Sequence, residues 1–122
     1  MSVKVLRSNE GDSVNRTGDA IFEGEVRARI LAEGSKDING SIVQFAAGAR
    51  TKFHTHTHDQ LLLVLSGIGK VGDREHTHVI GTGDSVLISA GTEHWHGAGD
   101  TGSPMSHLSI QPGGASSTVL DA

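Results

Sequence analysis

The stretch GARTKFHTHTHDQLLLVLSG, residues 48–67, places three histidines, His54, His56 and His58, at alternate positions and follows them with an apolar run. In a β-strand, residues i and i+2 point to the same face, so His54 and His56 should project side by side. Two imidazoles at that spacing can reach one metal ion. Gln60 stands at the turn into the next strand, from which its side chain can return beside the histidines. The stretch therefore predicts paired strands with a candidate metal site between them.

Two further His-x-His patterns occur in the chain. EHWHGA repeats the spacing with His94 and His96, and EHTH does so with His76 and His78. A His-x-His pattern alone is a weak signal, because a surface strand with two histidines is the commoner case. EHTH lies in a polar stretch bounded by glycines, so we expect His76 and His78 on an exposed hairpin, outside any site.

Short apolar runs with a period of two recur along the chain and favour strands over helices. Examples are INGSIVQF, SVLISA and SHLSI, and residues such as Gly, Asp, Ser and Asn separate them, as in EGSKDING and GTGD. The 17 glycines against two prolines also indicate many tight turns. Many short strands in one domain predict an all-β fold, an antiparallel sandwich or barrel.

The His54/His56 pair and the His94/His96 pair, together with the glycines around them, resemble the two signature motifs of the cupin family. The first motif, G-x5-H-x-H-x(3,4)-E-x6-G, fits at every spacing, with glutamine in place of the usual glutamate. The second, G-x5-P-x-G-x2-H-x3-N, fits in its glycines and histidine but has Ser89 for proline and Ala98 for asparagine. The matching residues are Gly48, His54, His56, Gln60 and Gly67, then Gly83, Gly91 and His94. This resemblance covers residues 48–98 and implies an antiparallel jelly-roll β-barrel, the cupin fold.

Longer stretches resemble one subgroup of small cupins. GARTKFHTH, GDSVLISAGTEHWHGA and MSHLSIQ are similar to the carboxymuconolactone-decarboxylase-associated cupins and to the manganese-dependent bacterial cupin hydroxynitrile lyases. These lyases also have glutamine as the oxygen ligand. Phe53 departs from the subgroup, which often has tryptophan there, and His58 stands at the tip of a loop where we expect it to be exposed. With FEGEVR, the resemblance runs from about residue 20 to residue 111.

The resemblance implies a set of site residues. The expected metal ligands are His54, His56, Gln60 and His94, and the residues expected around them are Thr51, His96, His107 and Gln111. His96 follows His94 by two residues, so its side chain should enter the same cavity. His96 and His107 are competing candidates for a general base, and the sequence leaves both open.

Three imidazoles and one neutral amide would leave a divalent ion most of its charge, which favours Lewis-acid chemistry. The resemblance favours Mn(II), with Fe(II), Ni(II), Co(II) or Zn(II) as alternatives. The expected function is a metal-dependent lyase acting on a small hydroxy or carbonyl compound, such as a hydroxynitrile, with a histidine base. One alternative is a dioxygenase or another cupin enzyme on a phenolic, sugar-acid or sulfonium substrate, and another is a non-catalytic cupin that binds a small ligand. A purely structural role is disfavoured because burying four polar ligands without an ion has a large desolvation cost.

Composition excludes several classes of function. The chain has no cysteine, so disulfides and thiolate ligands are excluded. The formal charge of -4, without a run of Lys and Arg, argues against binding to nucleic acid. No stretch approaches a membrane span and MSVKVLRSNE lacks the apolar core of a signal peptide, so we expect no membrane association and a cytoplasmic location.

We expect three regions along the chain: an N-terminal strand and polar loop in residues 1–19, the cupin barrel in residues 20–111, and a C-terminal tail in residues 112–122. The tail is small and polar, and either a flexible arm or an added edge strand is expected. The N-terminal VKVLR alternates apolar residues, which predicts a strand with no use in a minimal barrel. Small cupins commonly pair, so we expect a homodimer or a higher homo-oligomer.

Overall fold

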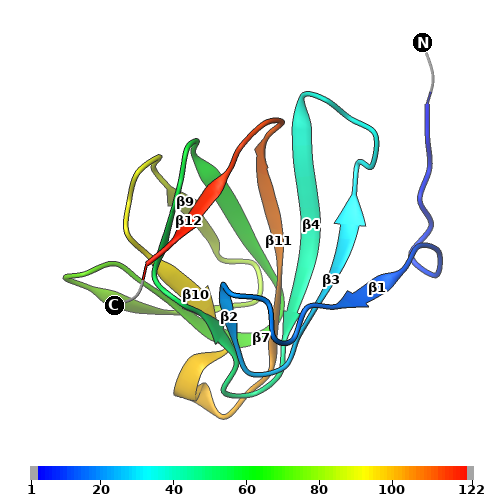
Figure 1. The fold of residues 1–122 in the computed structure, drawn as a ribbon. Coiled ribbons are helices and arrows are strands. Elements are labelled where there is room, and N and C mark those ends of the chain that lie inside the picture. Colours follow the sequence, from blue (N-terminus) through cyan, green and yellow to red (C-terminus); the bar gives the residue numbers. More distant parts are fainter. Residues whose placement is uncertain (1–2, 121–122) are drawn as a thin grey trace.

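The structure, a computed structural model, describes residues 3–120. Antiparallel strands curl into a barrel (Figure 1), which confirms the predicted all-β, antiparallel fold class. The elements are β1 (Ser13–Asn15), β2 (Phe22–Glu23), β3 (Val26–Leu31), β4 (Ile38–Phe45), β5 (Arg50–Thr51), β6 (His54–His56), β7 (Gln60–Gly72), β8 (Thr77–Gly81), β9 (Ser85–Ile88), β10 (Trp95–Gly97), the 3-10 helix η1 (Gly99–Thr101), β11 (Met105–Pro112) and β12 (Ser117–Val119). Within residues 3–120, no helix has the length and apolar character needed to cross a membrane.

The long strand β7 is shared by the two halves of the barrel. Its first half pairs with β11 and β9, and its second half, from Ile68 to Gly72, pairs with β8 and β10. β4, β3 and β1 continue the sheet beyond β11, and β5 and β2 continue it beyond β10. One strand therefore connects the segment that carries His107 with the segment that carries His96.

A β-bulge in β7 allows this strand to direct side chains into the core in both halves of the barrel. Val64 and Ser66 pair with consecutive residues of β11, so Leu65 is the extra residue. Before the bulge the even-numbered residues of β7 are buried, and after it the odd-numbered Gly69 and Val71 are buried. An extra residue shifts the alternation of a strand by one position and changes which side chains face the core.

The barrel interior is partly aliphatic and partly polar. Its apolar core consists of Val26, Val43, Phe45, Ala49, Leu62, Val64, Val71, Ile80, Ile88, Ala98 and Met105. The buried polar side chains are Thr51, His54, His56, Gln60, His94, His96, His107 and Ser109. Buried polar groups need partners or a ligand, so this second set marks the candidate site.

The structure corrects the prediction for the N-terminal segment. Residues 3–7, predicted as a strand, form none, and Val3 and Val5 are exposed. The first strand is β1, within the segment that was expected to be a polar loop. β1 pairs with β3 at the end of the sheet, and the N-terminal segment runs away from the barrel (Figure 1).

The C-terminal tail forms the added edge strand rather than a flexible arm. β12 pairs with β6, the strand of His54 and His56. The register sets Ser117 opposite His56 and Val119 opposite His54. The tail therefore lies directly against the strand that carries two of the expected metal ligands.

Candidate metal centre

Three histidines from the two motifs meet inside the barrel. His54 and His56 stand at alternate positions of β6, and both are buried. The main chain joins His94 to them, because the N–H of His54 donates to the carbonyl oxygen of His94 at 2.9 Å and the N–H of His94 donates to that of His54 at 3.1 Å. One ring nitrogen from each residue lies within 4.8 Å of the others, so this group could hold a metal ion.

The local main chain orients two of these rings. Nδ1 of His54 lies 2.8 Å from the carbonyl oxygen of Lys52, and Nδ1 of His94 lies 2.8 Å from that of Thr92. A carbonyl oxygen only accepts hydrogen bonds, so each Nδ1 carries the proton and each Nε2 keeps its lone pair. Metal-binding histidines typically have such a partner on the nitrogen that faces away from the metal.

Two serines that the sequence analysis missed orient the other two expected ligands. Nδ1 of His56 lies 2.8 Å from Oγ of Ser117, and Nε2 of Gln60 donates to Oγ of Ser109 at 2.9 Å, which leaves Oε1 as the free end of the amide. Ser109 follows His107 by two residues on one strand, so alternation could have found it. Ser117 lies in a small polar segment with no motif to identify it.

The residues fit a divalent metal ion. The four expected donor atoms, Nε2 of His54, His56 and His94 and Oε1 of Gln60, are buried without a hydrogen-bond partner. Each buried polar atom left unpaired has a free-energy cost of about 1–3 kcal/mol. A divalent ion would accept a lone pair from all four atoms and remove that cost, and nitrogen and neutral oxygen donors suit the first-row transition metals.

Burial keeps the three histidines neutral. It lowers the pKa of His54 from 6.5 to about 3; the carbonyl of Lys52 opposes this shift, and His94 and His56 add to it. Burial, followed by the neighbouring His94, lowers the pKa of His56 to about 4, and burial also lowers the pKa of His94. Neutral imidazole is the form that binds metal ions, so the site is ready for an ion at neutral pH.

We expect the metal-free protein to lose stability as the pH falls from 7 to 5.5. In the unfolded chain these histidines take up protons near their ordinary pKa of 6.5, whereas the folded chain takes them up only near pH 4 for His56 and pH 3 for His54. The unfolded state therefore binds more protons in this window, and stability decreases with decreasing pH. Urea unfolding in the presence of a chelator measures this, and a midpoint that stays constant or rises between pH 7 and 5.5 would contradict it.

A second pair of histidines lies beside the candidate ligands. The ring centroid of His96 is 5.4 Å from that of His54 and 5.7 Å from that of His94, and its Nδ1 lies 3.0 Å from Nε2 of His107. The main-chain N–H of His96 donates to Oγ1 of the buried Thr51 at 3.0 Å. Burial, and then His107, hold the pKa of His96 well below its usual value, and burial lowers the pKa of His107 to about 4. His96 thus lies between the candidate ligands and His107.

Gln111 lies on the same face of β11 as His107 and Ser109, next to a cavity of about 320 Å³. Nε2 of Gln111 is buried without a partner, so the amide has N–H groups available to a ligand. Ser109, the hydrogen-bond partner of Gln60, also lines this cavity, whereas the four candidate metal ligands do not. Its other lining residues are Arg16, Ile30, Leu31, Ala32, Glu33, Gly34, Ser35, Ile38, Asn39, Gly40 and Ser41.

The remaining histidines lie at the surface, as the sequence analysis expected. His58, His76 and His78 are exposed, and the rings of His76 and His78 have their centroids 6.4 Å apart. In the part of the chain that the structure describes, a group of three possible histidine or carboxylate ligands occurs only at His54, His56 and His94.

Known proteins are similar to this chain in sequence and in fold. Residues 41–117 match the family model described as the Cupin domain. The (R)-mandelonitrile lyase of Granulicella tundricola is 41% identical over 96 residues, which are 74% of this chain and 70% of that protein. A cupin-like protein of Thermotoga maritima is 28% identical with a TM-score of 0.74, over 85% of this chain and 84% of that one. The polyketide cyclase RemF of Streptomyces resistomycificus has a TM-score of 0.82 over 100% of this chain and 87% of its own, and at 16% identity this likeness concerns the fold.

Proposed function

Because the chain belongs to the cupin family, we propose that it is a metal-dependent lyase acting on a small hydroxy or carbonyl compound, with a hydroxynitrile as the specific case. The observation that carries the proposal is the donor set, three neutral imidazoles and one amide oxygen, all buried without hydrogen-bond partners. None of these donors neutralises the charge of a divalent ion. The relative named as a mandelonitrile lyase supports the reaction class.

A bound divalent ion, with Mn(II) favoured and Fe(II), Ni(II), Co(II) or Zn(II) as alternatives, would supply Lewis acidity that acidifies a hydroxyl or polarises a carbonyl. His54, His56, Gln60 and His94 would hold it. The amide of Gln60 presents its oxygen to the ion because its nitrogen is engaged with Ser109.

Cleavage of a hydroxynitrile requires a base but no oxidant. The bond between the hydroxyl-bearing carbon and the nitrile carbon breaks, and its electron pair leaves with cyanide. The hydroxyl loses its proton and becomes the carbonyl of an aldehyde or ketone, and cyanide takes up one proton. The residues of this chain therefore need to accept a proton from the hydroxyl and return one to the leaving group.

We assign the base to His96, with His107 as its support. In one of the two tautomeric arrangements of this pair, Nδ1–H of His96 donates to Nε2 of His107. Nε2 of His96 then has a free lone pair, and it has no hydrogen-bond partner among residues 3–120. The ring of His96 lies beside His54 and His94, whereas His107 lies on the other side of His96; Phe45 contacts both rings. This order favours His96 for the proton transfer.

The cavity beside Gln111 suits a small, partly apolar substrate. Its walls combine Ile30, Leu31 and Ile38 with polar side chains, and the unpaired N–H groups of Gln111 can donate to a substrate oxygen or nitrogen. A volume of about 320 Å³ lies at the lower end of the range for small-molecule sites.

A metal-by-substrate screen tests this proposal. The protein, loaded in turn with each of the five metals, is mixed with a panel of hydroxynitriles, and the release of cyanide and aldehyde is followed together with oxygen uptake. We expect cyanide release in at least one metal form without oxygen uptake. Oxygen uptake by the Fe(II) form would favour the dioxygenase alternative, and tight ligand binding without turnover in any form would favour a binding protein.

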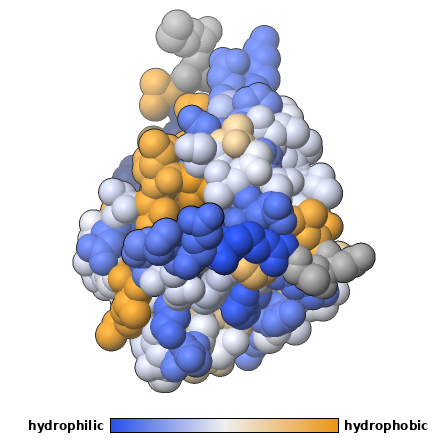
Figure 2. Space-filling view, turned by 90° about the vertical axis from the view of Figure 1, so that its left-hand side faces the viewer, coloured by the Kyte–Doolittle hydropathy of each residue, from blue (hydrophilic) through white to orange (hydrophobic). Residues whose placement is uncertain are grey.

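We also propose that the protein is a homodimer formed through the outer face of the sheet. Apolar side chains reach the surface of the molecule in groups (Figure 2). Leu61 pairs across the sheet with both Leu87 and Ile110, and Leu65 lies further along the same strand; all four are exposed by 37–70%. These four side chains form a contiguous exposed apolar patch, a type of surface that typically marks a protein–protein contact.

Light scattering at micromolar concentration should give twice the chain mass of 12.7 kDa. Leu87→Arg should shift the protein toward the monomer, because it places a charge on the most exposed of these four residues. Val79→Arg, on the edge strand β8, is a matched control that should leave the mass unchanged. A wild-type mass of 12.7 kDa would contradict the proposal.

A further inference from the structure

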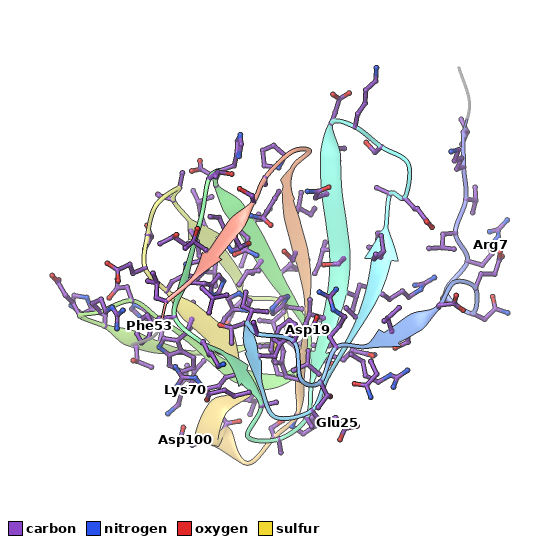
Figure 3. All side chains as sticks on the ribbon, in the orientation of Figure 1. Arg7, Asp19, Glu25, Phe53, Lys70 and Asp100 are labelled. Carbon is purple, nitrogen blue, oxygen red and sulfur yellow. The ribbon has the colours of Figure 1, made fainter. Side chains whose placement is uncertain are left out.

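The C-terminal strand β12 is attached to the barrel by few interactions. It forms a separate two-stranded sheet with β6, and its three residues are all exposed. At its ends, the N–H of Thr57 donates to the carbonyl oxygen of Ser116 at 3.0 Å, and the N–H of Leu120 donates to that of Phe53 at 2.9 Å. Figure 3 labels Phe53, the residue directly before His54. A short strand pair with little buried surface opens easily, so small changes in free energy decide whether β12 is docked.

The three candidate histidine ligands differ in how their rings are oriented. His54 and His94 each use a carbonyl oxygen two residues earlier in their own segment. His56 uses the hydroxyl of Ser117, which lies 61 residues further along the chain. The orientation of His56 therefore depends on whether the tail is docked, whereas that of the other two does not.

The contact with Ser117 also selects the proton position on His56. When the hydroxyl oxygen accepts from Nδ1–H, Nε2 is left with its lone pair, as a metal ligand requires. Without this partner, nothing else fixes the proton on Nδ1, and the ring can carry it on Nε2 instead. A docked tail therefore keeps the third imidazole ready for the ion.

We propose that β12 is part of the metal centre, with Ser117 as a positioning residue for His56, and that tail docking and metal binding are coupled. The inference rests on the proposed metal binding and is independent of the proposed reaction. Coupling of this kind is reciprocal, so the factor by which the docked tail strengthens metal binding equals the factor by which the metal strengthens docking.

The first test compares metal affinity among full-length variants. The metal-free protein is titrated with Co(II), whose visible absorption reports binding directly. Ser117→Ala should weaken Co(II) binding by at least ~10-fold, the usual scale for removing a partner of a metal ligand. Ser117→Thr keeps the hydroxyl and should restore the affinity.

Ser116→Ala is the matched control, because Ser116 lies next in the chain and its contacts with Thr57 are made by its main chain. We expect this variant to bind Co(II) like the wild type. Thr118→Pro removes an N–H at the centre of β12, opposite Thr55, and should detach the strand. It should weaken Co(II) binding at least as much as Ser117→Ala, and adding Ser117→Ala to it should have no further effect.

The second test measures docking by hydrogen exchange. Co(II) should slow the exchange of the Leu120 amide, which is bonded to Phe53, while the Ala115 amide, bonded to Pro112 outside the β12–β6 pair, should not change. In Ser117→Ala the slowing at Leu120 should be lost. If Ser117→Ala matches the wild type in both Co(II) affinity and Leu120 exchange, the inference is wrong and the metal centre stands. If the wild type binds no Co(II), the proposed metal centre itself is wrong.

Discussion

Replacing His54 by alanine is expected to empty the metal centre and to reduce turnover to that of the metal-free protein. His54 offers one of three ring nitrogens that lie within 4.8 Å of one another, so its loss leaves two imidazoles and one amide oxygen to hold the ion. Removing the hydrogen-bond partner of a metal ligand typically weakens metal binding by about 10–100-fold. Removing the ligand itself should weaken metal binding by more than that. Metal analysis by mass spectrometry after dialysis measures the effect.

The surface histidines provide the control for this prediction. His76→Ala and His78→Ala should leave the metal content unchanged, since both side chains are exposed and lie outside the group of candidate ligands. Gln60→Ala should have a smaller effect than His54→Ala, because a neutral amide is a poorer donor than imidazole. If metal content fell in His76→Ala and His78→Ala but not in His54→Ala, the metal centre would lie at the other histidine pair.

Replacing His96 by alanine is expected to lower turnover by at least roughly 100-fold, which is the usual scale for removing a general base. The bound metal and the fold should be retained. Nε2 of His96 has no hydrogen-bond partner and its ring lies beside His54 and His94, but it is not among the expected ligands. The measurement is turnover per bound metal ion, with circular dichroism and metal content as checks. A metal-replete His96→Ala protein with full activity would remove His96 from the mechanism.

His107→Ala separates the base from its support. His107 contacts His96 through one hydrogen bond of 3.0 Å and packs against Phe45. Its loss should lower turnover less than the loss of His96, because the lone pair on Nε2 of His96 remains. A larger loss in His107→Ala than in His96→Ala would reverse the roles of the two histidines.

Much of the candidate site could be predicted because the chemistry is concentrated in two spaced motifs. Alternation along β6 was enough to place His54 and His56 on one face, and the second motif supplied His94. The exposed positions of His76 and His78 followed from the polar residues and glycines around them. Alternation depends only on backbone geometry, the ligand set came from the resemblance to the cupin motifs, and the exposure of His76 and His78 came from local composition, so none of these predictions needed tertiary contacts.

The parts that could not be predicted depend on contacts between distant segments. Alternation does not reveal which strand lies against β6, so the role of Ser117 could not be seen in a small polar tail. The N-terminal residues 3–7 have the alternation of a strand but form none, because alternation along a segment does not determine whether a partner strand lies beside it. The order of His96 and His107 relative to the ligands likewise required the packed structure.

In the proposed function, a single ion held by His54, His56, Gln60 and His94 makes this chain a lyase. The most direct test titrates the metal-free protein with Mn(II) at saturating hydroxynitrile and follows cyanide release and bound metal together. We expect turnover to rise in proportion to bound Mn(II) and to level off at about one ion per chain, the capacity of one such donor set. Full turnover by the metal-free protein, or no cyanide release when Mn(II) is bound at the metal centre, would contradict this function.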